Sequence, residues 1–306
     1  MKDFNVNFPI SSFENLIIDI GWESLEDWVN FWSLKKNILS IDQFWNNKVN
    51  DDWIWGLAVP LLSHAYNLQN NFSDRRIIGL SALPGTGKTT LGKWLEAISL
   101  KLNFKIVVIS IDDFYLPSDE MKLAIKNNPW NVSRGFPGSH SVRLMNEKLL
   151  NWKINGELNV PVFDKSLRNG LGDRSHWRSD KPDLLILEGW FLGIEPCSMS
   201  INDQYNYPSE LSIHESTYRI NIQNNLNKYL DVWSLIDNIW HLKPLKFEYM
   251  NIWKSNQEKE MFLQKGNALQ DEKLSNFLRM LNVSLPQKCF DEINSYALLL
   301  IDHERN

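Results

Sequence analysis

The feature that most constrains this chain is an apolar run that leads into a glycine-rich loop and then into a helical pattern, over residues 77–90. Gly85 and Gly87 can adopt backbone angles closed to other residues, so that successive amide N–H groups can converge on phosphate oxygens at the start of a helix. The run matches the phosphate-loop pattern G-x-x-x-x-G-K-[ST], except that Ala82 stands at the first glycine. We therefore expect a buried strand, a phosphate-binding loop and a helix. The residues expected to bind a nucleotide are Pro84, Gly85, Thr86, Gly87, Lys88, Thr89 and Thr90.

Two residues of this loop carry the expected chemistry. Lys88 is expected to reach the outer phosphates of a nucleotide, and Thr89 to bind Mg²⁺ through its hydroxyl. The competing interpretation is a chance Gly-Lys-Thr sequence in an ordinary loop. The apolar residues before the loop, and the helical spacing of Leu91, Leu95 and Ile98 after it, favour the nucleotide site.

Composition limits the remaining possibilities. The chain has 306 residues, 43% of them hydrophobic, which allows a sizeable core in one large domain or two smaller ones. A formal net charge of -5, with both signs mixed along the sequence, argues against a general nucleic-acid binder. Cys197 and Cys289 lie far apart without metal-ligand spacing, so we expect two packing residues, no structural disulfide and a reducing intracellular setting. The N-terminus lacks a signal-like pattern and no stretch approaches the roughly 18 apolar residues of a membrane span, so we expect a soluble, cytoplasmic protein.

The N-terminal quarter of the chain is rich in tryptophan. Trp28 and Trp32 recur with apolar neighbours at helical spacing, which is typical of a helix with one buried face. Such an aromatic stripe could be a ligand-stacking surface, but burial in a core is the usual role. A polar, turn-rich run at 70–74 marks a boundary. We predict a tryptophan-rich helical extension at 1–75 and a second domain at 76–306. The tryptophans of the extension are Trp22, Trp28, Trp32, Trp45, Trp53 and Trp55.

Several apolar runs after the loop have the composition of strands buried on both faces. They cover residues 104–111, 184–187, 238–242 and 296–301. With the strand before the loop, and with helical patterns between the runs, they predict a doubly wound α/β fold whose mostly parallel sheet has five strands. Ligands of such sheets bind beyond the carboxyl ends of the strands, so polar residues that directly follow a strand are the first candidates for a site.

Acidic residues follow two of the predicted strands. Asp112 and Asp113 come directly after the second strand, where a carboxylate can accept the proton of a substrate hydroxyl during phosphoryl transfer. A helix cap or a strand-end turn is the other common role of aspartate at such a place. Glu188 follows the third strand, where an enzyme with a phosphate loop needs an acidic group near Mg²⁺ or its water.

Two loops are rich in glycine, arginine and turn residues. In the first, Arg134 and His140 bracket a Pro-Gly corner, which suits cationic donors held toward an anion. The second, over residues 161–178, is locally basic on an acidic protein and includes Lys165 and Arg174. A charged loop is usually solvated surface, but this one lies between the second and third strands, on the side of the expected nucleotide edge.

The motifs, taken in order, resemble one family. They are Leu83-Pro84-Gly85-Thr86-Gly87-Lys88-Thr89-Thr90, Ser110-Ile111-Asp112-Asp113-Phe114-Tyr115, Arg134-Gly135-Phe136-Pro137-Gly138-Ser139-His140, Phe163-Asp164-Lys165-Ser166 with Gly172-Asp173-Arg174, and Glu188-Gly189-Trp190-Phe191. This set is similar to the P-loop D-glycerate 3-kinase family of plants, cyanobacteria and fungi, with uridine kinase, pantothenate kinase and phosphoribulokinase as more distant relatives. The resemblance covers about residues 77–193 and continues weakly to Phe277. The family usually has an arginine after Trp253, where this chain has Lys254, and residues 1–75 lie outside the pattern.

The resemblance implies a P-loop kinase fold and the ATP-dependent phosphorylation of D-glycerate to 3-phosphoglycerate. It implies ATP and Mg²⁺ as cofactors, with Lys88, Asp112 and Glu188 as catalytic residues and Thr89 and Glu188 as metal ligands. Asp112 is preferred to Asp113 because it matches the catalytic aspartate of the relatives, and Arg134 and Arg174 are expected to hold the carboxylate of glycerate. The substrate-binding residues expected on this basis are Asp112, Asp113, Tyr115, Arg134, His140, Asp164, Lys165 and Arg174.

Two other functions stay open at this point. One is a related kinase that acts on a nucleoside or on pantothenate, for which an aromatic slot would be expected in place of cationic groups. The other is a nucleotide-binding switch protein with weak ATPase activity, which the departures at Ala82 and Lys254 allow. In each case the expected partners are ATP and at most a small molecule, with no nucleic acid and no membrane, and the oligomeric state stays open.

Overall fold

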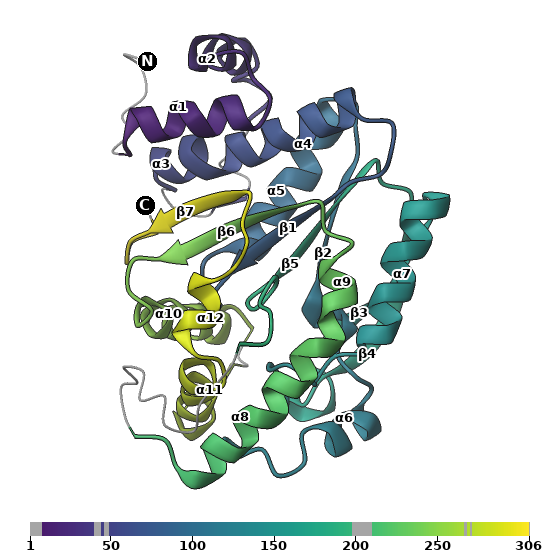
Figure 1. Cartoon of the computed structure of the whole chain (residues 1–306), viewed down its shortest axis with the longest axis vertical. Helices are drawn as coiled ribbons and strands as arrows, with labels where there is room; N and C mark the ends of the chain where they lie inside the picture. The colour runs from purple at the N-terminus through teal and green to yellow at the C-terminus, as the bar shows by residue number, and fades with distance from the viewer. Residues whose placement is uncertain are drawn as a thin grey trace.

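A single parallel sheet organises the chain (Figure 1). The computed structural model describes residues 8–39, 44–45, 49–197, 210–265, 268–269 and 271–305. All neighbouring strands of the five-stranded sheet run parallel, which confirms the predicted doubly wound α/β fold. In spatial order the strands are β2 (Ile106–Ser110), β5 (Leu184–Gly189), β1 (Ile77–Ala82), β6 (Asn238–Pro244) and β7 (Ala297–Ile301).

Helices cover both faces of the sheet, because the central strands are apolar on both sides. Along β1, Ile77 packs into one hydrophobic cluster and Ile78 into the other, as the alternation of side chains in a strand requires. Helices α1 to α5 share the cluster of Ile78, whereas α7 to α9, α11 and α12 share that of Ile77. The helices are α1 (Ile10–Asp19), α2 (Leu25–Leu34), α3 (Asp51–Trp53), α4 (Val59–Asn71), α5 (Lys88–Lys101), α6 (Ser118–Ala124), α7 (Val142–Asn155), α8 (Ile213–Leu226), α9 (Leu230–Trp233), α10 (Tyr249–Lys265), α11 (Asp271–Val283) and α12 (Gln287–Asp291). Within the described ranges, every helix is too short or too polar to pass through a bilayer.

The N-terminal helices form a layer on the sheet (Figure 1), and its tryptophans pack into the hydrophobic cluster of Ile78. Trp28 and Trp32 are fully buried, and the indole N–H of Trp28 donates to the Ser63 hydroxyl at 2.8 Å. The indole N–H of Trp240, on β6, donates to Nδ1 of His64, on α4, at 2.9 Å. A core role for the aromatic stripe is therefore confirmed. The division of the chain at residue 75 stays a prediction.

Removal of the N-terminal layer should destabilise the rest of the chain. Without residues 1–75, Ile78, Leu80 and Trp240, all fully buried here, would lose the helices that cover them. Each large apolar side chain returned to water costs about 1.5–3 kcal/mol, and a domain has only about 5–15 kcal/mol to lose. We expect a chain of residues 76–306 to aggregate, or to melt far below the full chain in a thermal scan. A truncated chain that stays monomeric and melts at the same temperature would contradict this prediction.

A hairpin stands where the sequence suggested a basic loop. Strands β3 (Leu158–Asp164) and β4 (Asp173–Asp180) pair antiparallel in a separate two-stranded sheet. The turn between them contains Asn169 and Gly170, both with positive φ. The sequence of β4 hides the strand, because apart from Trp177 it is charged or polar and it carries no β-branched residue.

The expectation for the cysteines is wrong. Cys197 and Cys289 form a disulfide with their Cα atoms 6.3 Å apart, although 92 residues separate them in sequence. Cys289 lies in α12, and Cys197 follows the segment that leaves the end of β5. Spacing along the sequence could not show that the fold brings these two segments together.

Candidate active site

The phosphate loop has the backbone geometry that its sequence predicts. Gly87 caps α5 with a φ of 98°, and Gly85 has a φ of 85°. The chain therefore uses glycine at the two positions where a left-handed backbone is needed. Ala82 is the last residue of β1, is buried and does not have a positive φ, so alanine fits at the first position of the motif without strain.

Gly85 is also the point at which the loop touches α10. A Cβ atom at this position would lie 2.6 Å from the backbone carbon of Trp253 and 2.8 Å from the backbone nitrogen of Lys254. Neither backbone atom can move without moving α10. The close approach therefore holds the loop against a helix that lies far away in sequence.

Gly85→Ala should weaken ATP binding by an order of magnitude or more. The added methyl group clashes with α10, and alanine at a positive φ costs about 1 kcal/mol or more by itself, so the loop must shift. Gly170→Ala is the matched control, since Gly170 has a φ of 88° but no atom within 4 Å of the added methyl. Titration calorimetry with ATP measures the difference. Equal ATP affinities for the two variants would show that contact with α10 does not shape the loop.

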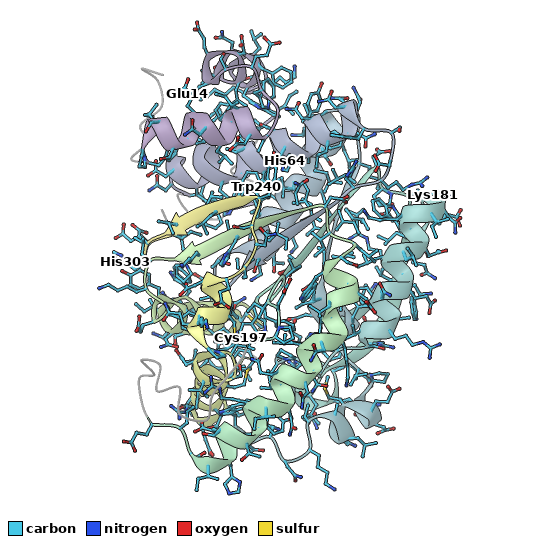
Figure 2. The ribbon with its side chains drawn as sticks, viewed as in Figure 1. Glu14, His64, Lys181, Cys197, Trp240 and His303 are labelled. Atoms are coloured by element: carbon cyan, nitrogen blue, oxygen red, sulfur yellow. A yellow bond between two sulfur atoms is a disulfide. The ribbon has the colours of Figure 1, made fainter. Side chains whose placement is uncertain are left out.

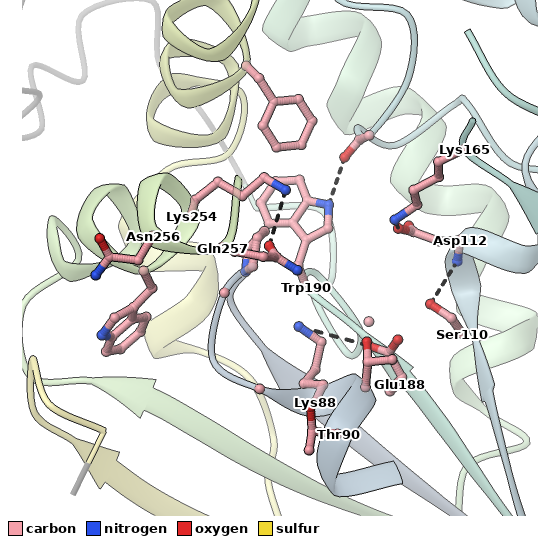
Figure 3. A pocket seen from close by; sticks show the side chains of 18 of the residues that line it. Lys88, Thr90, Ser110, Asp112, Lys165, Glu188, Trp190, Lys254, Asn256 and Gln257 are labelled. Atoms are coloured by element: carbon pink, nitrogen blue, oxygen red, sulfur yellow. Dashed lines mark hydrogen bonds and ion pairs between the residues drawn. The ribbon is translucent and has the colours of Figure 1, made fainter. Parts of the chain in front are cut away.

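A cavity of about 230 Å³ opens above this loop (Figure 3). The loop and the ends of β2 and β5 form its floor, and α10 and the tip of the β3–β4 hairpin form parts of its wall. In Figure 3, Asn256 lies on one side of Lys88, and Asp112 with Lys165 lies on the other. Of the residues expected from the sequence, Pro84, Gly85, Gly87, Lys88, Thr89, Thr90, Asp112, Tyr115, Lys165 and Glu188 line it.

Lys88 is held at the base of the cavity. Its ammonium group donates to the carbonyl oxygens of Ala82, at 2.7 Å, and Leu83, at 3.1 Å, and lies 3.9 Å from Oε2 of Glu188. Burial lowers the pKa of Lys88, while the negative charges of Glu188 and Asp112 oppose that shift. Burial also raises the pKa of Glu188, against the nearby positive charge of Lys88. A buried cation beside the loop amides is suited to bind anionic phosphate groups.

The two neighbouring aspartates have different surroundings. Asp113 accepts the N–H of Ser110 at 3.0 Å and that of Phe163 at 3.4 Å, so its carboxylate joins β2 to the hairpin. Burial raises the pKa of Asp113 to about 6 despite these hydrogen bonds. Asp112 lines the cavity, and its Oδ2 accepts a hydrogen bond from the ammonium group of Lys165 at 2.7 Å. Although burial alone would raise it, Lys165 and His140 hold the pKa of Asp112 well below its usual range.

His140 lies next to Asp112 but outside the lining of the cavity. The imidazole is fully buried, with Nδ1 2.8 Å from the hydroxyl of Tyr229 and Nε2 3.7 Å from Oδ1 of Asp112. Burial lowers the pKa of His140, and the negative charge of Asp112 opposes that shift. Tyr115 stacks on the imidazole with ring centroids 4.4 Å apart and reaches the cavity itself. The two stacked rings lie beside the 3-10 turn, Ile111–Phe114, that carries Asp112.

The other predicted substrate residues lie outside the lining of the cavity, as does Thr86. Arg134 donates to the carbonyl oxygens of Gly170, at 3.0 Å, and Leu171, at 2.6 Å. Arg174 donates through Nε to the carbonyl oxygen of Tyr115 at 3.2 Å. Asp164 accepts the N–H of Ser166 at 2.8 Å, in the turn after β3. The contacts of Arg134 and Arg174 join the hairpin to the segments between β2 and α7, and the contact of Asp164 is internal to the hairpin.

Several residues of the lining were not among the site residues predicted from the sequence, although most of them lie in or near the recognised motifs. They are Ser110, Gly135, Gly189, Trp190, Trp253, Lys254, Asn256, Gln257, Glu260, Phe277 and Arg305. Trp190 belongs to a recognised motif, and its indole N–H donates to the carbonyl oxygen of Gly135 at 2.7 Å. Lys254 forms an ion pair with Glu258, one turn along α10. Nothing in the sequence signals Arg305, which donates to the carbonyl oxygen of Gly85 at 3.4 Å.

Comparison with known proteins decides the family. No family model matches the chain. It is 31% identical over 229 residues to the uncharacterized kinase mug58 of Schizosaccharomyces pombe, across 70% of this chain and 80% of that protein. It is 30% identical over 215 residues to the chloroplastic D-glycerate 3-kinase of Arabidopsis thaliana, across 66% of this chain but only 45% of that longer protein. The chain belongs to the P-loop glycerate kinase family.

A solved structure supports the fold of this member of the P-loop glycerate kinase family. The D-glycerate 3-kinase from Cryptococcus neoformans aligns with a TM-score of 0.64 over 82% of this chain and 94% of that one. Sequence identity in that alignment is 23%, so the likeness concerns the fold. The sequence relatives confirm the P-loop glycerate kinase family predicted from the motifs, and with it a kinase that binds a nucleotide at a phosphate loop.

Proposed function

We propose that this chain is an ATP-dependent kinase that phosphorylates a hydroxyl of a small organic acid, with D-glycerate as the acceptor and 3-phosphoglycerate as the product. One observation carries the proposal. Lys88 of the phosphate loop and the Asp112–Lys165 pair line a single cavity, so groups suited to a phosphate donor and to an acidic alcohol share one space. The similarity to the Arabidopsis D-glycerate 3-kinase supports the choice of acceptor.

The donor half of the mechanism rests on the loop. Loop amides and Lys88 bind the outer phosphates and stabilise the charge that develops as the terminal phosphoryl group moves. Thr89 and Glu188 offer a hydroxyl and a carboxylate oxygen to the same cavity. Mg²⁺ prefers oxygen ligands and keeps waters and phosphates in its shell, so this donor set fits it. Bound there, the metal would neutralise phosphate charge.

The acceptor half rests on Asp112. Its carboxylate would orient the attacking hydroxyl and take its proton as the oxygen bonds to the terminal phosphorus of ATP and ADP departs. Buried His140, with Nε2 3.7 Å from Oδ1, lies on the other side of this carboxylate from Lys165.

A nucleoside acceptor is the second candidate, and aromatic side chains favour it. Trp190 and Phe277 line the cavity together with Tyr115. Such rings can stack on a base. The indole of Trp190, however, is held by its hydrogen bond to Gly135, and cationic Lys165 stands beside Asp112.

An acceptor panel separates these candidates. With ATP and Mg²⁺, and with ADP release as the readout, we expect efficient turnover of D-glycerate and little of uridine or pantothenate. Efficient use of uridine or pantothenate with no use of glycerate would overturn the proposal. ADP release that no acceptor stimulates would instead favour the nucleotide switch.

A further inference from the structure

Among the described residues that line the cavity, only one cation touches the carboxylate of Asp112. Lys88 is bound to loop carbonyls, Lys254 is paired with Glu258 on α10, and Arg305 donates to the loop at Gly85. Lys165, at the tip of the hairpin, donates to Asp112 at 2.7 Å. A negatively charged acceptor that approaches Asp112 would therefore meet Lys165 before any other cation of the cavity.

This ion pair conflicts with the role of Asp112 as a base. Lys165 covers Oδ2, while His140 stands 3.7 Å from Oδ1. A carboxylate that is paired with an ammonium group holds protons weakly, and an acceptor hydroxyl must displace the ammonium group to reach the oxygen. The Lys165 side chain is 54% exposed and lies in the turn of the hairpin, so its ammonium group can move away from Asp112 without disturbing the core.

We propose that Lys165 passes from Asp112 to the carboxylate of the acceptor, so that an acidic acceptor uncovers its own base. The inference rests on the proposed function and names the residue that selects acids. In a short hydroxy acid the carboxylate and the terminal hydroxyl lie at opposite ends of one small molecule, so the two ends can reach the adjacent groups of Lys165 and Asp112. A neutral acceptor would also separate Lys165 from Asp112, but it would offer Lys165 no new anionic partner. The free energy of the broken ion pair would then not be recovered, so the site would favour acidic acceptors over neutral ones.

The inference shifts the expected carboxylate contact away from the arginines. Arg134 is used by the carbonyl oxygens of the hairpin turn, and Arg174 by Tyr115. Nη2 of Arg174 is buried without a hydrogen-bond partner, which makes Arg174 the strongest rival for the carboxylate. Arg174 does not line the cavity, however, whereas Lys165 does.

The test compares D-glycerate with its uncharged amide in wild type, Lys165→Ala, Lys165→Arg and Arg174→Ala. In wild type we expect a preference for the acid on the order of 10²-fold in kcat/KM. Lys165→Ala should raise the KM for D-glycerate by about tenfold or more, the range for one charged hydrogen bond, and leave the KM for ATP unchanged. Its kcat/KM for the amide should stay level or rise, because the base is no longer covered. Lys165→Arg should restore most of the preference.

Lys181→Ala is the matched control. Lys181 pairs with Glu157 at 2.7 Å, at the open end of the same hairpin, and both side chains are exposed (Figure 2 labels Lys181). This variant should keep the kinetics of wild type for acid and amide.

Three results would overturn the inference. If Lys165→Ala lowers kcat equally for acid and amide with no change in KM, Lys165 acts on the transferring phosphoryl group, and the kinase assignment survives. If Arg174→Ala alone removes the preference for the acid, the arginine holds the carboxylate. If wild type phosphorylates a neutral acceptor and ignores D-glycerate, the inference and the proposed acceptor fail together.

Discussion

Lys88→Ala should lower phosphoryl transfer by on the order of 10²–10³ or more while the protein stays folded, the range observed when one preorganised donor to a developing charge is removed. Lys88 is the cation that the loop itself places at the base of the cavity, where it contacts two loop carbonyls and approaches Glu188. Its burial makes its charge effective, because little water screens it there. Alanine keeps the helical conformation at the start of α5, so the loop can still form.

The measurement is steady-state turnover of D-glycerate at saturating ATP, with thermal melting as the check on folding. Lys93→Ala is the control, since Lys93 is an exposed lysine on the same helix. It should turn over like wild type. A Lys88→Ala protein with turnover near that of wild type would remove this loop as the site of the donor phosphates.

Asp112→Asn should lower turnover by on the order of 10²–10⁴, the range for loss of a general base, and leave ATP binding largely unchanged. Asparagine keeps the size of the side chain and an oxygen that can accept a hydrogen bond from Lys165, but it cannot accept the proton of the acceptor. Asp112 lines the cavity, and its carboxylate is hydrogen-bonded to Lys165 of the hairpin.

The neighbouring aspartate provides the comparison. Asp113→Asn replaces a carboxylate that accepts hydrogen bonds from the N–H groups of Ser110 and Phe163. It should therefore lower the melting temperature more than Asp112→Asn does, and lower turnover less. Turnover and ATP affinity of both variants decide between the two residues. A larger loss of turnover in Asp113→Asn would show that the wrong aspartate carries the base.

The elements predicted best from the sequence are those with strong local patterns. The strand before the loop, the glycines at 85 and 87 and the acidic residues after β2 and near the end of β5 all follow from residue type and order, because parallel strands end at one edge of the sheet. Even the departure at Ala82 has a simple reason, since that position is extended and does not need glycine.

What the sequence could not predict depends on contacts between distant segments. Strand β4 has no β-branched residue, so the sequence predicted a basic loop over residues 161–178 instead of a hairpin. In the fold, Arg134 and Arg174 join that hairpin to the segments between β2 and α7, and Lys165 at its tip reaches Asp112. The approach of α10 to Gly85 likewise has no local signal, because Trp253 is 168 positions further along the chain.

The most direct test of the account is identification of the product. Wild-type protein incubated with ATP, Mg²⁺ and D-glycerate should give ADP and 3-phosphoglycerate in equal amounts, as read by ³¹P NMR, with little free phosphate. Lys88→Ala and Asp112→Asn should suppress that signal together. A spectrum that shows ADP with only inorganic phosphate, or ATP that stays intact with D-glycerate and disappears with a neutral acceptor, would contradict it.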